Sequence, residues 1–190
     1  MKENPIVEFS LSTAKLTKLL IFSVLFLTVG LWMIITNPQI SNPVFNNVII
    51  KTLAFYGSTI MGLFGIYFFT KKLLDKNPGI IISDQGIYDN TSAFKFGLIP
   101  WSDISAIYDS SIQTSIAAKQ YFVTIALQDP EKYIDRETNF LKRKLLVANT
   151  RSYGSPVHIS TNGLITNHAE LSKILLAYFD KYKSDNQQTS

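Results

Sequence analysis

Two stretches decide the fold: LLIFSVLFLTVGLWMIIT at residues 19–36 and TLAFYGSTIMGLFGIYFFT at residues 52–70. They run for eighteen and nineteen residues without a charge. At about 1.5 Å per residue each forms a helix of roughly 27–29 Å, close to the bilayer's hydrocarbon thickness of about 30 Å. A buried helix of a soluble protein normally keeps one polar face, and neither stretch has one. We therefore expect two transmembrane helices, at about residues 19–36 and 48–70.

A cleavable signal peptide is the main alternative for the first stretch. Eighteen residues precede it, no small-x-small cleavage motif follows it, and the second apolar stretch comes soon after. These features favour a retained membrane segment. We therefore expect an N-terminal segment with both helices (residues 1–76), one globular domain (residues 77–183) and a disordered tail (residues 184–190).

The charge distribution excludes one class of function for the globular part. Residues 77–190 hold eleven Lys/Arg and eleven Asp/Glu, so the net charge of +4 comes from residues 1–76. A nucleic-acid-binding domain carries its own basic surplus, so we expect no nucleic-acid partner. The chain has no cysteine, which excludes disulfides and thiolate metal sites.

Lysines flank the two apolar stretches at the ends remote from their connecting loop. Five of them form this group, while residues 37–47 of the loop carry no charge: Lys15, Lys18, Lys71, Lys72 and Lys76. Only Lys51 lies near the loop, where we expect its side chain to extend to the headgroups. The positive-inside rule then places both termini in the cytoplasm and the loop outside, with the five lysines as anchors at the interface of the cell inner (plasma) membrane.

Small residues in the second apolar stretch predict close packing of the two helices. Gly57, Gly62 and Gly65 lie within it, and small residues let helix backbones approach each other in a membrane.

The chain after residue 77 has the pattern of an antiparallel β domain with helices. Short β-rich runs are separated by turns, at residues 79–83, 87–88, 97–101, 104–108, 121–127 and 157–160. Asp129-Pro130-Glu131 has the form of a helix start, followed by a helix or two half-helices to residue 146. Asn167-His168-Ala169-Glu170 has capping-box spacing before a C-terminal helix. The apolar stripe of this helix comprises Leu171, Ile174, Leu175, Tyr178, Phe179 and Tyr182.

The string GIIISDQGIYDN, followed by FGLIPWSDISAIY, resembles the opening strands of bacterial pleckstrin-homology-like membrane proteins, and the chain is similar to a two-span family among them. The resemblance covers residues 19–183 and implies a curled pair of antiparallel sheets, or barrel, with a C-terminal helix closing one end. Residues 129–156 would be an insertion before the last strand, which leaves the strand order open. The expected fold class is thus α+β: two transmembrane helices followed by a pleckstrin-homology-like domain.

The sequence contains no pattern typical of a catalytic site. Neither G-x-S-x-G nor a glycine-rich phosphate loop occurs. Trp101 is expected in the core, and Asp103 is expected to cap or orient the turn before Ile104. His158 and His168 have no partner at metal-ligand spacing. We therefore expect no enzyme, no metal and no cofactor.

The run Lys142-Arg143-Lys144, with Arg151 nearby, is the domain's one local charge surplus and a candidate site for anionic lipid or a partner. Each basic residue near an anionic leaflet contributes about 1 kcal/mol. A solvated helix face balanced by the preceding acids is the simpler interpretation. Three hypotheses follow: a membrane-anchored scaffold that binds a protein partner or itself, which we favour, a module that senses anionic lipid, and a membrane enzyme or transport accessory. The third is weakest because the apolar stretches contain no acid, His or Arg that would mark a pathway.

Overall fold

The computed structural model describes residues 5–94, 96–115 and 118–187. The chain forms two compact units, Ser12–Lys76 and the combination of Met1–Leu11 with Asn77–Ser190. The first unit is a pair of helices, α1 (Thr13–Thr36) and α2 (Val48–Leu74). Both helices are long and apolar enough to cross a membrane. They extend the expected spans by several residues at the end where the lysines lie.

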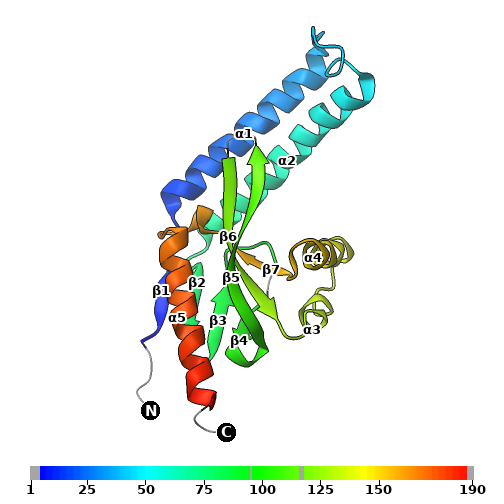
Figure 1. The fold of residues 1–190 in the computed structure, drawn as a ribbon. Helices are drawn as coiled ribbons and strands as arrows, with labels where there is room; N and C mark the ends of the chain where they lie inside the picture. The colour runs from blue at the N-terminus through cyan, green and yellow to red at the C-terminus, as the bar shows by residue number, and fades with distance from the viewer. Residues whose placement is uncertain (1–4, 95, 116–117, 188–190) are drawn as a thin grey trace. The chain divides into compact units, whose positions relative to one another are not determined.

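Small residues bring α1 and α2 into contact along their length. A Cβ atom on Gly62 would lie 2.6 Å from the backbone nitrogen of Leu27, and one on Gly65 would lie 2.3 Å from Ser23 Oγ. Gly30 meets Thr59 in the same way, so residue numbers rise along α1 as they fall along α2 and the helices are antiparallel (Figure 1). The packing predicted for Gly62 and Gly65 is confirmed. The prediction for Gly57 is wrong, because nothing lies within 4 Å of its Cβ position.

Lys51, at the loop end of α2, turns inward instead of extending away from the helices. Its Nζ donates to the carbonyl oxygen of Pro38 at 2.9 Å and to Asn46 Oδ1 at 3.4 Å, and the residue is buried. The loop has carbonyl and amide oxygens that no helix satisfies, and the ammonium group supplies donors for them. The expectation that Lys51 extends to the headgroups is therefore wrong.

The second unit contains two antiparallel sheets. The first has the order β1-β2-β3-β4 and the second β5-β6-β7. The strands are β1 (Val7–Phe9), β2 (Ile80–Ser83), β3 (Gly86–Asp89), β4 (Leu98–Pro100), β5 (Ile104–Ser115), β6 (Ala118–Leu127) and β7 (Val157–Ile159). Gly86 has φ of 150°, and a Cβ there would lie 2.1 Å from Ile99 O, so β3 and β4 can pair at this point only with glycine.

Strand β1 precedes the helix pair in sequence yet belongs to the sheet. Its residues pair with β2, with Val7 opposite Ile82 and Phe9 opposite Ile80. The sequence pattern predicted no strand before residue 77, and residues 1–76 were expected to form one N-terminal segment. In the structure the chain thus leaves the sheet before α1 and returns to it after α2.

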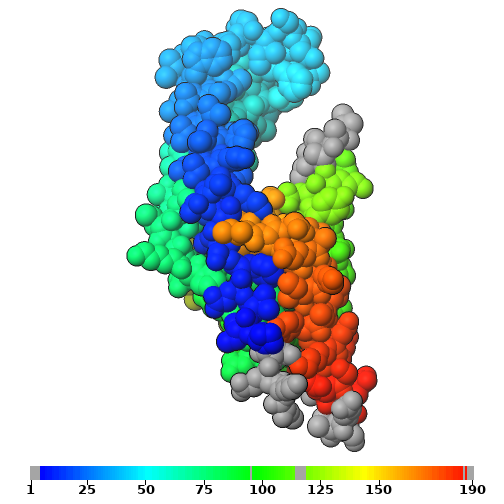
Figure 2. All heavy atoms as spheres, turned by 90° about the vertical axis from the view of Figure 1, so that its left-hand side faces the viewer, coloured from blue at the N-terminus to red at the C-terminus, as the bar shows by residue number. Residues whose placement is uncertain are grey.

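The core of this unit lies between the two sheets and α5 (His168–Gln187). Ile80, Ile82, Val123 and Ile125 are fully buried, and so is Leu175 of the predicted helical stripe. Tyr178 donates a hydrogen bond to the carbonyl oxygen of Pro5, and Figure 2 shows the blue N-terminal strand beside the orange and red C-terminal helix. The helix continues to Gln187, into the tail expected to be disordered, and the last three residues of that tail lie outside the described ones.

The insertion forms two helices, α3 (Glu131–Ile134) and α4 (Phe140–Tyr153). Despite their presence, β7 pairs directly with β6, which gives the strand order that the sequence left open. Asp129 Oδ1 accepts from Lys132 N at 3.2 Å, so the predicted helix start is confirmed. The two sheets do not close: β4 and β5 are joined by the 3-10 turn Trp101–Asp103 without pairing, so the expected barrel is wrong for the described strands.

Candidate functional site

Helix α4, which carries the candidate basic residues, is well defined at both ends. Asn139 Oδ1 accepts from Lys142 N at 3.1 Å as an N-cap. Gly154 ends the helix in the left-handed conformation, with φ of 77°. Leu146 is 2% exposed and anchors one side of the helix in the core, which leaves the opposite side to solvent.

The structure brings three of the four grouped basic residues to one groove and gives Lys142 a separate role. Lys142 Nζ donates to the carbonyl oxygen of Ala93 at 2.9 Å, so this side chain ties α4 to the loop after β3. Arg143 pairs with Asp135 at 2.6 Å. Lys144 Nζ lies 4.5 Å from the ring centroid of Phe140. Arg143, Lys144 and Arg151 line one surface groove, and Lys142 does not.

The outward face of α4 combines these cations with exposed apolar side chains. Phe140 is 71% exposed, Leu141 66% and Leu145 49%. The helix contains no acidic residue, since its sequence is FLKRKLLVANTRSY. We call the exposed residues Phe140, Leu141, Lys144, Leu145 and Arg151 the α4 face. Clusters of Phe and Leu beside Lys and Arg are typical of helices that lie in a membrane interface.

Four of the five lysines predicted as membrane-interface anchors lie at one end of the helix pair. Lys15 and Lys18 lie in the first turns of α1, and Lys71 and Lys72 in the last turn of α2. Lys71 Nζ lies 6.0 Å from the ring of Tyr67, and Lys72 Nζ lies 5.9 Å from that of Phe68. Lys76 follows the helix and is exposed.

Trp101 and Asp103 hold the domain together. Trp101 is 3% exposed, as predicted for a core residue, and its Nε1 donates to the carbonyl oxygen of Ser83 at 2.8 Å. Asp103 Oδ2 accepts from Lys132 Nζ and from Tyr133 Oη, both at 2.6 Å. Asp103 thus joins the 3-10 turn to α3, a long-range contact that the expected local role did not include. The hydrogen bond from Lys132, followed by that from Tyr133, holds the pKa of Asp103 below its usual value.

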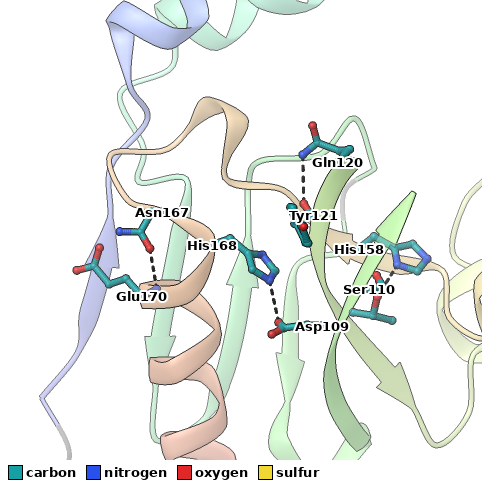
Figure 3. A network of polar contacts seen from close by, with 9 residues as sticks. Asp109, Ser110, Gln120, Tyr121, His158, Asn167, His168 and Glu170 are labelled. Carbon is teal, nitrogen blue, oxygen red and sulfur yellow. Dashed lines mark hydrogen bonds and ion pairs between the residues drawn. The ribbon is translucent and has the colours of Figure 1, made fainter. Parts of the chain in front are cut away.

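The two histidines lie on opposite faces of the β5-β6-β7 sheet (Figure 3). His158 Nδ1 lies 2.9 Å from Thr124 Oγ1, which lies 2.6 Å from Ser110 Oγ, and His158 Nε2 lies 2.8 Å from the carbonyl oxygen of Ser155. Burial lowers the pKa of His158. Its neutral form is therefore favoured.

His168 is the first residue of α5, and its Nε2 lies 3.0 Å from Asp109 Oδ1. The ring also lies 5.6 Å from that of Tyr121. Asn167 Oδ1 accepts from Glu170 N at 2.9 Å, which confirms the predicted cap and fixes the start of this helix. No local sequence pattern indicates the contact with Asp109, because the two residues lie 59 positions apart in the chain.

The described residues contain no group of three or more His, Asp or Glu side chains arranged to hold a metal ion. No family model, no curated protein and no solved structure matches the chain.

Proposed function

We propose that this chain is a membrane-anchored, non-enzymatic binding module whose α4 face contacts anionic lipid headgroups at the cytoplasmic side of the plasma membrane. In this proposal α1 and α2 cross the membrane, and the two sheets with α5 form a pleckstrin-homology-like domain beside it. The observation that carries the lipid contact is the α4 face itself, which joins exposed apolar side chains to cations on a helix without acids.

The exposure of large apolar residues on the helix pair supports a membrane span. Phe22 is 61% exposed on α1, and Ile60 and Phe64 are 65% and 61% exposed on α2. In water such a surface would be far more apolar than a soluble monomer carries. In a bilayer the same surface meets hydrocarbon.

The pairing of β1 with β2 supports a hairpin topology. Because these strands flank the helix pair in sequence and hydrogen-bond to each other, both must lie on the same side of any membrane that α1 and α2 cross. Cleavage after α1 would also remove β1 from the sheet, which speaks against a signal peptide. The lysines at the outer ends of this helix hairpin support a cytoplasmic location for that side under the positive-inside rule.

Short connections keep the domain next to the membrane. Ser10–Ser12 join β1 to α1, and Asp75–Gly79 join α2 to β2. Five residues span at most about 17 Å when fully extended. If α1 and α2 cross the membrane, these connections keep the domain within reach of anionic headgroups, and the α4 face needs only modest affinity for them.

The energy of such a contact is large enough to matter. Lys144 and Arg151 together contribute about 2 kcal/mol next to an anionic leaflet. That free energy changes the population ratio of docked to undocked orientations by roughly 30-fold. Partial insertion of Phe140 and Leu141 adds apolar burial on top of the charge contribution.

The absence of cysteine from the chain allows a direct test on the full-length protein. A spin label at Ser152→Cys, beside the α4 face, reports access of a water-soluble relaxation agent in nanodiscs of phosphatidylglycerol or of phosphatidylcholine. We expect protection of the label in the anionic discs and loss of that protection in the variant Lys144→Glu/Arg151→Glu.

A matched control changes the net charge equally without touching α4. Lys119 and Lys173 are exposed on β6 and α5, so Lys119→Glu/Lys173→Glu should keep the protection. Equal access in both lipids, or protection that survives the α4 reversal, would overturn the proposal. If in-cell crosslinking instead recovers a protein that the α4 reversal releases, the scaffold hypothesis replaces it.

A further inference from the structure

A cavity of about 270 Å³ lies on the face of the β5-β6-β7 sheet opposite α5. The loop between β3 and β4, the sheet and the inner side of α4 line it. Successive residues of a strand point to opposite faces, so Asp109 and Tyr121 face α5 while Ser110 and Phe122 face the cavity (Figure 3). Four aromatic side chains dominate its walls: Phe94, Phe96, Phe122 and Tyr153.

The polar network at one wall of the cavity has a fixed direction of hydrogen bonding. The carbonyl oxygen of Ser155 can only accept, so His158 Nε2 carries the proton of the neutral ring and Nδ1 accepts. Thr124 Oγ1 must then donate its one proton to His158 Nδ1. It follows that Ser110 donates to Thr124 Oγ1 across their 2.6 Å contact.

Ser110 consequently faces the cavity as an acceptor. Its hydroxyl proton is committed to Thr124, and only the lone pairs of Oγ remain for a ligand. Thr124 is fully buried and cannot exchange its partners for water. A ligand with a donor satisfies these lone pairs, whereas a ligand with only an acceptor meets them with repulsion.

We propose that this cavity binds a small aromatic molecule with one hydrogen-bond donor, of the indole or phenol type, whose donor reaches Ser110 Oγ. The size fits, because a cavity of about 150 Å³ already holds benzene. The walls fit as well, because aromatic rings pair edge-to-face or offset with other rings. The site is separate from the α4 face, so it goes beyond the proposed function and does not depend on it.

The test uses indole and N-methylindole, which differ in the donor. Full-length protein in nanodiscs is titrated with each, and affinity is followed by saturation-transfer NMR. We expect indole to bind about fivefold more tightly, the fold-change of one neutral hydrogen bond. In Ser110→Ala that ratio should fall to about one, because the acceptor is gone.

Ser111→Ala is the matched control, since Ser111 is the next residue of β5 and is exposed on the opposite face. It should keep the indole preference. A second variant, Ile112→Trp, fills the cavity from its wall and should weaken both ligands at least tenfold. Equal affinity of the two ligands for the wild type, no binding of either, or a preference that survives Ser110→Ala would each overturn the proposal.

Discussion

The helix pair and the sheet domain use the same apolar side chains in opposite arrangements. In α1 and α2 the large residues point outward, as with Phe22 at 61% exposure, while Ser23, Gly62 and Gly65 face the partner helix. In the domain Ile82 and Leu175 are fully buried. The comparison indicates that the two regions fold against different surroundings.

The two regions are also held together by different forces. Water drives apolar groups into the domain core, where each buried side chain contributes about 1.5–3 kcal/mol. Hydrocarbon provides no such drive, so helices in a membrane associate through close contact of small residues. The same substitution should therefore have different costs in the two regions.

The largest expected effect is the loss of a core leucine. Leu175→Ala should destabilise the domain by about 2–5 kcal/mol because it removes a fully buried side chain and leaves a cavity. Leu25→Ala makes the same change on α1, where the residue is 52% exposed, and should cost about 0.5 kcal/mol. Hydrogen exchange of each region, in full-length protein in nanodiscs, measures both.

Equal costs for the two leucine variants would break the comparison. The helix pair would then need a buried environment of its own, such as a second copy of the chain, in place of lipid.

A smaller effect is expected at the helix contact. Gly62→Ala places a Cβ 2.6 Å from the backbone of Leu27, so the helices must separate at a cost of about 1–3 kcal/mol. Gly57→Ala is the matched control, because nothing lies within 4 Å of that position and alanine favours the helix by up to about 1 kcal/mol. Spin labels on cysteines introduced at Ile21 and Tyr67 report the distance between the helices.

We expect the distance to increase and broaden for Gly62→Ala and to stay unchanged for Gly57→Ala. The opposite result, with Gly57 as the sensitive position, would place another helix against the outer face of α2.

Local patterns in the sequence predicted most of the elements. The uncharged runs mark α1 and α2, the i, i+3, i+4 stripe marks α5, and Asn167 caps that helix as its spacing indicates. Strand β1 was missed because it holds three residues and pairs with a strand more than 70 residues later. Such pairing leaves no local pattern, since its register depends on where the helix hairpin returns the chain.

The candidate site shows a different limit of sequence reasoning. Lys142, Arg143 and Lys144 are adjacent in sequence, but successive helical residues are turned by about 100°, so the three side chains point in different directions. Arg143 and Lys144 border one groove, whereas Lys142 lies outside it. Residues seven apart do share a face, which is why Lys144 and Arg151 line the same groove. Helical spacing could have identified this pair, whereas the contact of Lys142 with Ala93 depends on a loop 49 residues away.

The smallest expected effect concerns pH and should appear in the domain alone. The described helices α1 and α2 contain no acidic residue, whereas Asp103 in the domain binds Lys132 and Tyr133 with a lowered pKa. A carboxylate with a lowered folded-state pKa stabilises the protein above its unfolded pKa of about 3.9, and this contribution is lost as pH falls through the folded value. Asp103→Asn should cost about 1 kcal/mol at pH 7, since Lys132 is partly solvent-exposed.

Unfolding of the domain, followed by near-UV circular dichroism from pH 7 to pH 2, gives the measurement. The free energies of unfolding of the wild type and Asp103→Asn should converge at low pH. Protonation of Asp103 then removes from the wild type the same charged interaction that the substitution removes at every pH. Tyr133→Phe deletes one of the two donors and should fall between them. Parallel curves would mean that Asp103 contributes no pH-dependent stability. Any greater acid sensitivity of the domain than of the helix pair would then arise at other carboxylates.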